Sequence, residues 1–282
     1  GARHKTPCGS GAACGGEGPS GRHRSVSSPN LIKHEQFPSR FLRNRRDLIV
    51  YLPPGYQEQS GRAYPILYLH DGQNLFDGAT SFIPGMDWHV GQTADRLIYE
   101  GRVEPLIIVG LYNAGKQRLG EYTPTRAPKL GGGRANRYAK FLLEEVRPFV
   151  QSQYRIAEGA ERTGIGGSSL GGLVSLYLGL KMPKIFGRIA ALSPSVWWNE
   201  RVILRFAAAA PVQPHPRVWL DAGTREGGRT VEDVERFRDV LLGKGWQLER
   251  DLHYERVEGA EHNEAAWAKR VGPFLQFLFP AG

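Results

Sequence analysis

The chain has 282 residues, of which 40% are hydrophobic, 23% charged and 10% aromatic. This is ordinary globular usage, and it excludes a disordered chain, a collagen, a coiled coil and a small disulfide scaffold. No stretch approaches the roughly 20 apolar residues that a membrane-spanning helix needs. The formal net charge is +9, and residues 1–46 contribute +7 of it through nine Lys or Arg and two Glu.

Residues 1–29 are the part of the chain least suited to a packed core. They are rich in Gly, Ser and basic residues and lack apolar periodicity, which predicts a disordered basic arm. Both cysteines, Cys8 and Cys14, lie there at a spacing that matches no metal site. Basic arms can bind nucleic acid, but no aromatic residues interleave with these charges, so a solvated tail is favoured and no nucleic-acid partner is expected. Residues 30–282 are predicted to be a single domain.

Beyond the arm, apolar runs of strand length alternate with helical patterns. Strands are predicted at 31–39, 46–53, 64–70, 106–111, 163–168, 188–192, 217–223 and 252–257. Helices are predicted at 137–155, after residue 169, at 230–242 and at 267–278. This alternation indicates an α/β fold with a mostly parallel central sheet and helices on both faces.

One polar segment interrupts the alternation. Residues 112–136 are rich in Gly, Pro and Arg and carry no clear apolar period. Loops of this length inside a domain usually form the rim or lid of a functional site, and a surface insertion without function is the alternative. We expect this segment to border a site.

The sharpest motif is GSSLG at 167–171, which fits G-x-S-x-G with Ser169 at its centre. An apolar strand precedes it and a helical pattern follows, so the flanking glycines allow a tight turn that projects the Ser169 hydroxyl. A phosphate-binding turn is the alternative, but no G-K-[ST] arrangement follows and no acidic residue is placed for a ribose. The motif therefore predicts a serine nucleophile, with the N–H of Leu170 as one oxyanion donor.

A serine nucleophile needs a base and an orienting carboxylate, which on this type of fold follow in the order serine, acid, histidine. His262 comes after the last predicted strand and is the expected base. Glu226 is favoured as the acid, because it lies where the chain leaves the sheet after residue 223. Asp221, inside that strand, is the next candidate, and Asp233 is a further one.

The remaining pocket residues are predicted from their position after strands. The second oxyanion donor is expected in the loop after residue 70, from Gln73 or its neighbour. Four further side chains are candidates to contact substrate, with core packing as the alternative for the aromatic ones: Trp88, Arg118, Trp197 and Trp198. His70 and Asp71 predict no metal site, because no matching cluster lies elsewhere. Neither a metal nor an organic cofactor is expected.

Six segments in a fixed order carry a resemblance to a known family. They are VYLPPGY at 50–56, YLHDGQNLF at 68–76, EYTP at 121–124, GGSSLGG at 166–172, LSPSVWW at 192–198 and EHNEAAW at 261–267. With these, residues 40–279 resemble the putative esterase family of α/β-hydrolases, which includes feruloyl and acetyl-xylan esterases, enterochelin esterase, esterase D and the mycolyl-transferring antigen 85 proteins. The basic arm departs from the family pattern.

The resemblance implies an α/β-hydrolase fold for residues 30–282 and a serine esterase that forms an acyl-enzyme. It implies Ser169 as nucleophile, His262 as base and an acid in the loop after Gly223, which supports Glu226. The expected substrate is a small-molecule or carbohydrate ester of carbohydrate-linked, aromatic or siderophore type. An acyltransferase of the same fold and a non-catalytic binding protein are the alternatives. A soluble protein is expected, cytoplasmic or exported, and its oligomeric state is not predicted.

Overall fold

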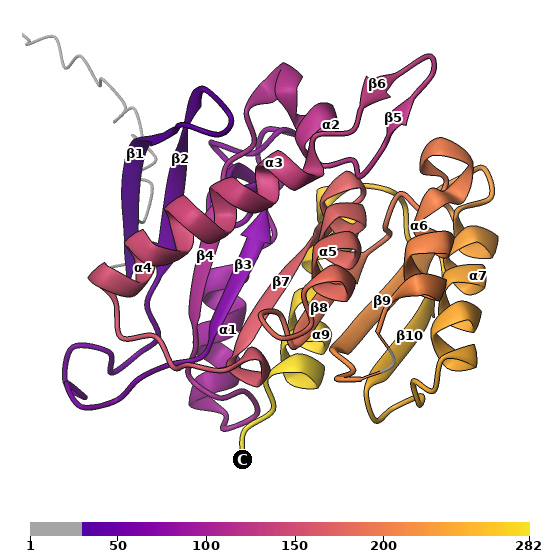
Figure 1. Ribbon diagram of the computed structural model, residues 1–282. Helices are drawn as coiled ribbons and strands as arrows, with labels where there is room; N and C mark the ends of the chain where they lie inside the picture. The colour runs from indigo at the N-terminus through magenta and orange to yellow at the C-terminus, as the bar shows by residue number, and fades with distance from the viewer. Residues whose placement is uncertain (1–29, 212) are drawn as a thin grey trace, which may run out of the picture.

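The computed structural model describes residues 30–211 and 213–282, and an eight-stranded sheet runs through the centre of this region (Figure 1). The sheet order is β1-β2-β4-β3-β7-β8-β9-β10. The strands are β1 (Leu31–Ser39), β2 (Asn44–Tyr51), β3 (Ile66–His70), β4 (Ile107–Leu111), β7 (Thr163–Ser168), β8 (Arg188–Leu192), β9 (Arg217–Gly223) and β10 (Leu252–Val257). The predicted basic arm, with Cys8 and Cys14, lies outside the described residues.

The sheet is parallel except at one side. Strands β4, β3, β7, β8, β9 and β10 pair in parallel, while β1 and β2 pair antiparallel to their neighbours. Parallel strands place their carboxyl ends at one edge, so the loops that follow β3, β4, β7, β8, β9 and β10 all meet there. The predicted mostly parallel sheet is confirmed.

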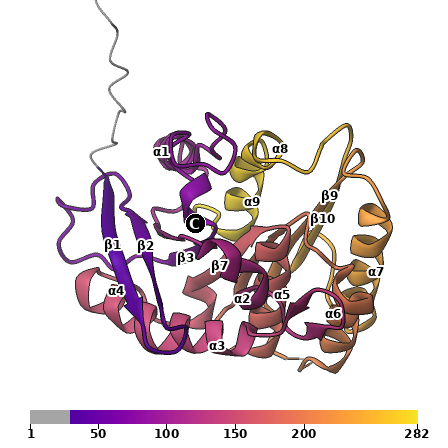
Figure 2. The same ribbon diagram turned by 90° about the horizontal axis from the view of Figure 1, so that it is seen from above.

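Helices cover both faces of the sheet. They are α1 (Val90–Tyr99), α2 (Arg118–Glu121), α3 (Ala135–Lys140), α4 (Arg147–Gln153), α5 (Leu170–Lys181), α6 (Trp198–Ala209), α7 (Thr230–Gly243), α8 (Glu264–Ala268) and α9 (Val271–Leu278). Helices α1 and α9 pack against each other on one face, and α3 to α7 lie on the other (Figure 2). The strands supply both cores by alternation, because Ile66 and Tyr68 point to one face and Leu67 and Leu69 to the other.

Some predicted elements differ from the observed ones. The predicted helix 137–155 is a continuous run of α3, a π-helical segment η3 (Phe141–Val146) and α4. The predicted C-terminal helix is two helices, α8 and α9, which meet at Lys269 and Arg270. Helices α1 and α6 had not been predicted.

The polar segment 112–136 is also more regular than expected. It holds the 3-10 turn η2 (Gly115–Gln117), helix α2 and a two-stranded hairpin of β5 (Arg126–Ala127) and β6 (Gly131–Gly132). Two further 3-10 turns lie elsewhere: η1 (Gly72–Asn74) follows β3, and η4 (Ala160–Arg162) precedes β7. None of the described helices has the length and apolar content required to cross a membrane.

Candidate active site

Ser169 occupies the turn between β7 and α5. Its backbone has φ 56° and ψ −121°, a conformation that non-glycine residues adopt only where the surrounding structure holds them there. A Cβ atom on Gly167 would lie 3.0 Å from the carbonyl carbon of Gly171 and 3.2 Å from its Cα. The glycines of the motif therefore allow the turn to close, as the sequence predicts.

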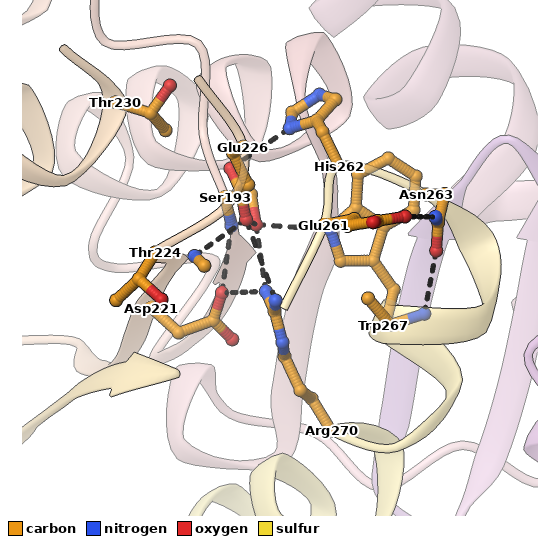
Figure 3. Close-up of polar contacts among 12 residues, drawn as sticks. Ser193, Asp221, Thr224, Glu226, Thr230, Glu261, His262, Asn263, Trp267 and Arg270 are labelled. Atoms are coloured by element: carbon orange, nitrogen blue, oxygen red, sulfur yellow. Dashed lines mark hydrogen bonds and ion pairs between the residues drawn. The ribbon is translucent and has the colours of Figure 1, made fainter. Parts of the chain in front are cut away.

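His262 and Glu226 meet above the carboxyl ends of β9 and β10 (Figure 3). The His262 Nδ1 atom lies 3.0 Å from Glu226 Oε2, and the Glu226 side chain is fully buried while 37% of the His262 side chain is exposed. Because a carboxylate only accepts hydrogen bonds, this contact places the ring proton on Nδ1. The Nε2 atom is then left with a free lone pair, as a general base requires.

The Glu226 carboxylate is held ionised by its neighbours. Its other oxygen, Oε1, accepts hydrogen bonds from Ser193 Oγ at 2.5 Å and from the Gly223 N–H at 2.7 Å. Burial raises the pKa of Glu226, but the hydrogen bonds from His262, Ser193 and Gly223 outweigh it, so the pKa lies below its ordinary value. The group is therefore a carboxylate, not an acid, across the neutral range.

The two alternative acids contact other partners. Asp221 is fully buried in β9, where its carboxylate pairs with Arg270 Nη1 at 2.6 Å. Asp233, in α7, pairs with Arg201 at 2.5 Å. Neither has a hydrogen bond to His262 among the described residues.

Ser169 and His262 line one cavity of about 480 Å³. No hydrogen bond joins the two side chains in the described part of the chain, and the Ser169 hydroxyl lies 3.3 Å from Ser195 Oγ instead. Catalytic hydrogen bonds in unliganded enzymes are often absent or long and form once substrate is bound. The cavity brings the two groups to the same space without joining them.

The loop after β3 forms another wall of this cavity. Gln73 lines it, and the Gln73 side chain is anchored because its Oε1 accepts the Asn113 N–H at 3.2 Å. A Cβ on Gly72 would lie 2.6 Å from the carbonyl carbon of Gly110, so glycine is needed for this loop to pass over β4. Leu170 is the first residue of α5, where N–H groups have no acceptor in their own helix.

Arg118 and Asp71 form an ion pair in the cavity wall. The guanidinium donates from Nε to Asp71 Oδ1 at 2.8 Å and from Nη2 to Oδ2 at 2.7 Å, and Asn113 Nδ2 donates to Oδ1 at 2.8 Å. Burial raises the pKa of Asp71, but the charge and hydrogen bonds of Arg118 and the Asn113 amide lower it by more. The pKa therefore lies below its ordinary value, and Asp71 stays ionised. The pair places a fixed polar surface in the cavity that Ser169 also lines.

Glu264 is a cavity residue that sequence reasoning missed. It is the first residue of α8, it is buried, and its Oε1 accepts a 3.4 Å contact from Asn74 Nδ2. Burial raises its pKa, and the nearby Asp71 charge adds to the effect. Its position two residues after His262 in the chain was the available signal.

The predicted tryptophans do not line this cavity. Trp88 is fully buried and packs against Trp267, with ring centroids 6.0 Å apart. Trp198 is fully buried and donates from Nε1 to the Thr125 carbonyl at 3.0 Å, and Trp197 is half exposed outside the cavity. Among the predicted substrate contacts only Arg118 lies in the cavity wall. Trp267, which was not predicted, lines it.

The described residues contain no group of three or more His, Cys, Asp or Glu side chains that could hold a metal ion. The reactive groups at the cavity are the Ser169 hydroxyl, the His262 imidazole and the Glu226 carboxylate that contacts it. A serine at a strand-to-helix turn, with a His–carboxylate pair after later strands of a mostly parallel sheet, defines an α/β-hydrolase.

Comparison with known proteins gives the family. The model of the family described as "Putative esterase" matches residues 39–277, so the chain belongs to that family and is a carboxylic ester hydrolase. It is 27% identical over 251 residues to the protein YbbA of Bacillus subtilis, which covers 84% of this chain and 93% of that one. It is 31% identical over 198 residues to the siderophore enterobactin esterase of Emericella nidulans, covering 64% of this chain and 65% of the relative.

A solved structure supports the fold. The BES protein from Bacillus cereus superimposes with a TM-score of 0.72 at 22% identity, covering 93% of this chain and 99% of that one. At this identity the likeness concerns the fold. The predicted α/β-hydrolase fold is thereby confirmed.

Proposed function

We propose that the protein is a serine esterase in which Ser169 is the nucleophile, His262 the general base and Glu226 the orienting acid. One observation carries the proposal: the strained turn presents Ser169 to the cavity that His262 also faces, while Glu226 fixes the His262 tautomer. No other described serine combines this backbone conformation with a place in that cavity.

The reaction proceeds in two halves. When an ester binds, the Ser169 hydroxyl turns from Ser195 toward His262 and attacks the carbonyl carbon, while His262 Nε2 takes the proton. The N–H groups of Leu170 and Gln73 stabilise the oxyanion. The tetrahedral intermediate then collapses: the ester C–O bond breaks, and the alkoxide leaves with the proton from His262.

The second half regenerates the enzyme. Water enters the cavity, His262 takes its proton, and the resulting hydroxide attacks the acyl carbon bound to Ser169. The acid leaves as Ser169 recovers its proton from His262. Glu226 holds the imidazole in place in both halves and stabilises the imidazolium, without taking the proton itself.

For the substrate, we propose an ester of the siderophore type. The support is the 31% identity to a siderophore enterobactin esterase, together with a cavity wall that offers hydrogen-bonding groups from Arg118, Asn113 and Glu264. These polar groups stand among apolar side chains such as Phe82, Ile83 and Trp267, a combination that suits an acyl group carrying hydroxyls or amides better than a plain alkyl chain.

The catalytic roles are tested with Ser169→Ala and a short p-nitrophenyl ester. The variant should lose at least about 10³-fold in kcat, because the nucleophile is absent. Mass spectrometry after fluorophosphonate labelling should find the label on Ser169 and not on the neighbouring Ser195. Near-normal turnover by the variant, or labelling at Ser195, contradicts the assignment.

The substrate is tested by comparing kcat/KM for enterobactin with that for methyl ferulate, both followed by chromatography of the products. We expect enterobactin to be the better substrate by at least about tenfold, a difference of about 1.4 kcal/mol in transition-state binding. A preference for the ferulate ester overturns the siderophore proposal and leaves the catalytic roles untouched.

A further inference from the structure

A chain of buried polar groups continues behind Glu226, on the side away from His262 (Figure 3). Ser193 Oγ contacts three of them: Glu226 Oε1 at 2.5 Å, Arg270 Nη1 at 2.8 Å and Trp267 Nε1 at 3.1 Å. A guanidinium and an indole N–H can only donate, so both donate to the serine oxygen. The single Ser193 proton is therefore directed to Glu226, and the hydroxyl cannot turn away without breaking the arrangement.

Arg270 is shared between two carboxylates. Its side chain is 3% exposed, its Nη1 pairs with Asp221 Oδ1 at 2.6 Å, and its Nη2 lies 3.5 Å from Glu226 Oε1. In the described part of the chain Nη2 has no other polar partner. A buried cation between two buried carboxylates compensates the charge of both. Removing the cation alone is strongly destabilising, because it leaves the carboxylates buried without compensation.

Asp221 in turn fixes Arg270 and the Ser193 backbone. Its Oδ2 accepts from Trp219 Nε1 at 2.7 Å, and its Oδ1 accepts from the Ser193 N–H at 2.9 Å as well as from Arg270. The loop after β8 and the start of α9 are thus joined to β9 by one carboxylate. The strand acid that sequence reasoning ranked second for the triad lies one layer behind the triad.

We propose that Arg270 and Ser193 are positioning residues that hold Glu226 ionised and aimed at His262, with Asp221 as their anchor. The inference rests on the proposed function, because it concerns how the acid of that triad is held. Arg270 supplies the compensating charge and Ser193 supplies the directed hydrogen bond. Neither touches the substrate; both act through Glu226.

The electrostatic consequence has a defined sign. The charged groups that face the Glu226–His262 pair are Arg270, 3.5 Å from Glu226, and Asp221 from behind, and Glu264 from the cavity side. Removing the Arg270 charge leaves Glu226 without its cationic neighbour, and a protonated His262 then becomes the only compensation. Protonated His262 is stabilised, so the acid limb of the profile of kcat/KM against pH moves to higher pH.

The experiment compares Arg270→Met, Arg270→Lys and Ser193→Ala across pH 5 to 9 with a p-nitrophenyl ester. For Arg270→Met we expect kcat/KM at pH 7 to fall about 10-fold to 100-fold, with KM little changed. The acid limb should shift up by about one pH unit, the low end of what a neighbouring charge causes. Arg270→Lys keeps a charge without the planar fork, so most of the shift should be absent and the acid limb should stay close to that of the parent.

Ser193→Ala tests the same inference where Arg270→Met fails to fold. It removes one hydroxyl and leaves the Arg270–Asp221 pair in place. We expect a loss of about tenfold in kcat and an upward shift of the acid limb smaller than that of Arg270→Met, because Glu226 loses its directed donor. A Ser193→Ala enzyme with the pH profile and kcat of the parent overturns the inference.

The matched control is Arg188→Met. Arg188 pairs with Glu104 at 3.0 Å at the amino end of β8, at the edge of the sheet opposite to the site. Its loss should lower stability without moving the acid limb. A shift as large as that of Arg270→Met shows that general destabilisation moves the limb and also overturns the inference. The proposed function fails separately, through an active Ser169→Ala enzyme in the same assay.

Discussion

Two carboxylates compete for the triad role in the sequence, and only one reaches the imidazole. Asp221 lies inside β9, so its side chain is fixed by the strand and turns toward Arg270. Glu226 follows the strand end, and its longer side chain spans the remaining distance to His262. The position of Glu226 after the strand end pointed to its pairing with His262, which the structure contains, but the partner that occupies Asp221 could not be predicted.

Glu226→Gln should separate the roles of the two acids. Gln keeps the shape but carries no charge, and its amide group can offer His262 Nδ1 a donor, which favours the wrong tautomer. We expect kcat to fall by about 10² to 10⁴-fold. The measurement is steady-state hydrolysis of a p-nitrophenyl ester, with thermal unfolding as the check on folding. Full activity in a folded variant would remove Glu226 from the triad.

At the scale of elements, the strands were the most predictable part of the chain. Runs such as 106–111 and 163–168 are apolar or Gly-rich because helices cover both faces, and the observed strands agree with them within a few residues. Helix α1 was missed although Val90, Ala94 and Leu97 recur at helical spacing, and the apolar run that begins at Val202 in α6 is short enough to fit a strand as well. The break between α8 and α9 places Arg270 under Glu226, and no local pattern indicates that contact.

Helix α2 is tied to the sheet by a buried ion pair. Glu121, at its end, accepts from Arg46 Nη2 of β2 at 2.8 Å, and each side chain is 1% exposed. Glu121→Ala would leave Arg46 buried without compensation, and we expect a loss of about 3 to 5 kcal/mol in the free energy of unfolding. Urea titration measures it. Glu100→Ala, which breaks the exposed pair with Arg96, is the control and should cost less than about 1 kcal/mol.

The loop after β3 depends on one glycine. A methyl group at Gly72 would collide with the backbone of β4, so Gly72→Ala should displace Gln73, whose N–H is the proposed oxyanion donor. Loss of one oxyanion donor lowers kcat by about 10² to 10³-fold. The measurement is kcat beside the melting temperature, with Gly61→Ala as control because space around Gly61 is open. Equal kcat in the two variants would argue against a role for this loop in the reaction.

For the whole molecule, two buried carboxyls make stability depend on pH in opposite directions. Glu226 has a pKa below its ordinary value, so its contribution is present above the unfolded pKa and is lost as the pH falls through the folded one. Burial raises the pKa of Asp221 to about 6, and the charge of Glu226 adds to the rise. Arg270, Trp219 and the Ser193 N–H lower this pKa, but by less than burial raises it. The contribution of Asp221 to the free energy of unfolding is present below its unfolded pKa of 3.8 and is lost as the pH rises through about 6.

Asp221→Asn should expose this dependence. Asn does not ionise, so the variant should gain stability relative to the parent between pH 4 and pH 8, by up to about 3 kcal/mol. Asn also places a donor against one of the present donors to Asp221, but that cost does not vary with pH. The measurement is the difference in unfolding free energy at the two pH values. A constant difference would contradict a raised pKa for Asp221.

The three residues proposed as the triad, Ser169, Glu226 and His262, all follow the later strands of the sheet, whereas the wall that carries Asp71 and Arg118 comes from β3 and the segment after β4. The proposed triad is thus encoded late in the chain and most of the polar wall early, although Glu264 of the wall is late and the proposed oxyanion donor Gln73 is early. Drift in the earlier stretch can retune which acyl group is accepted while the later one remains unaltered. A family built in this way can change its substrates while it keeps the same catalytic residues.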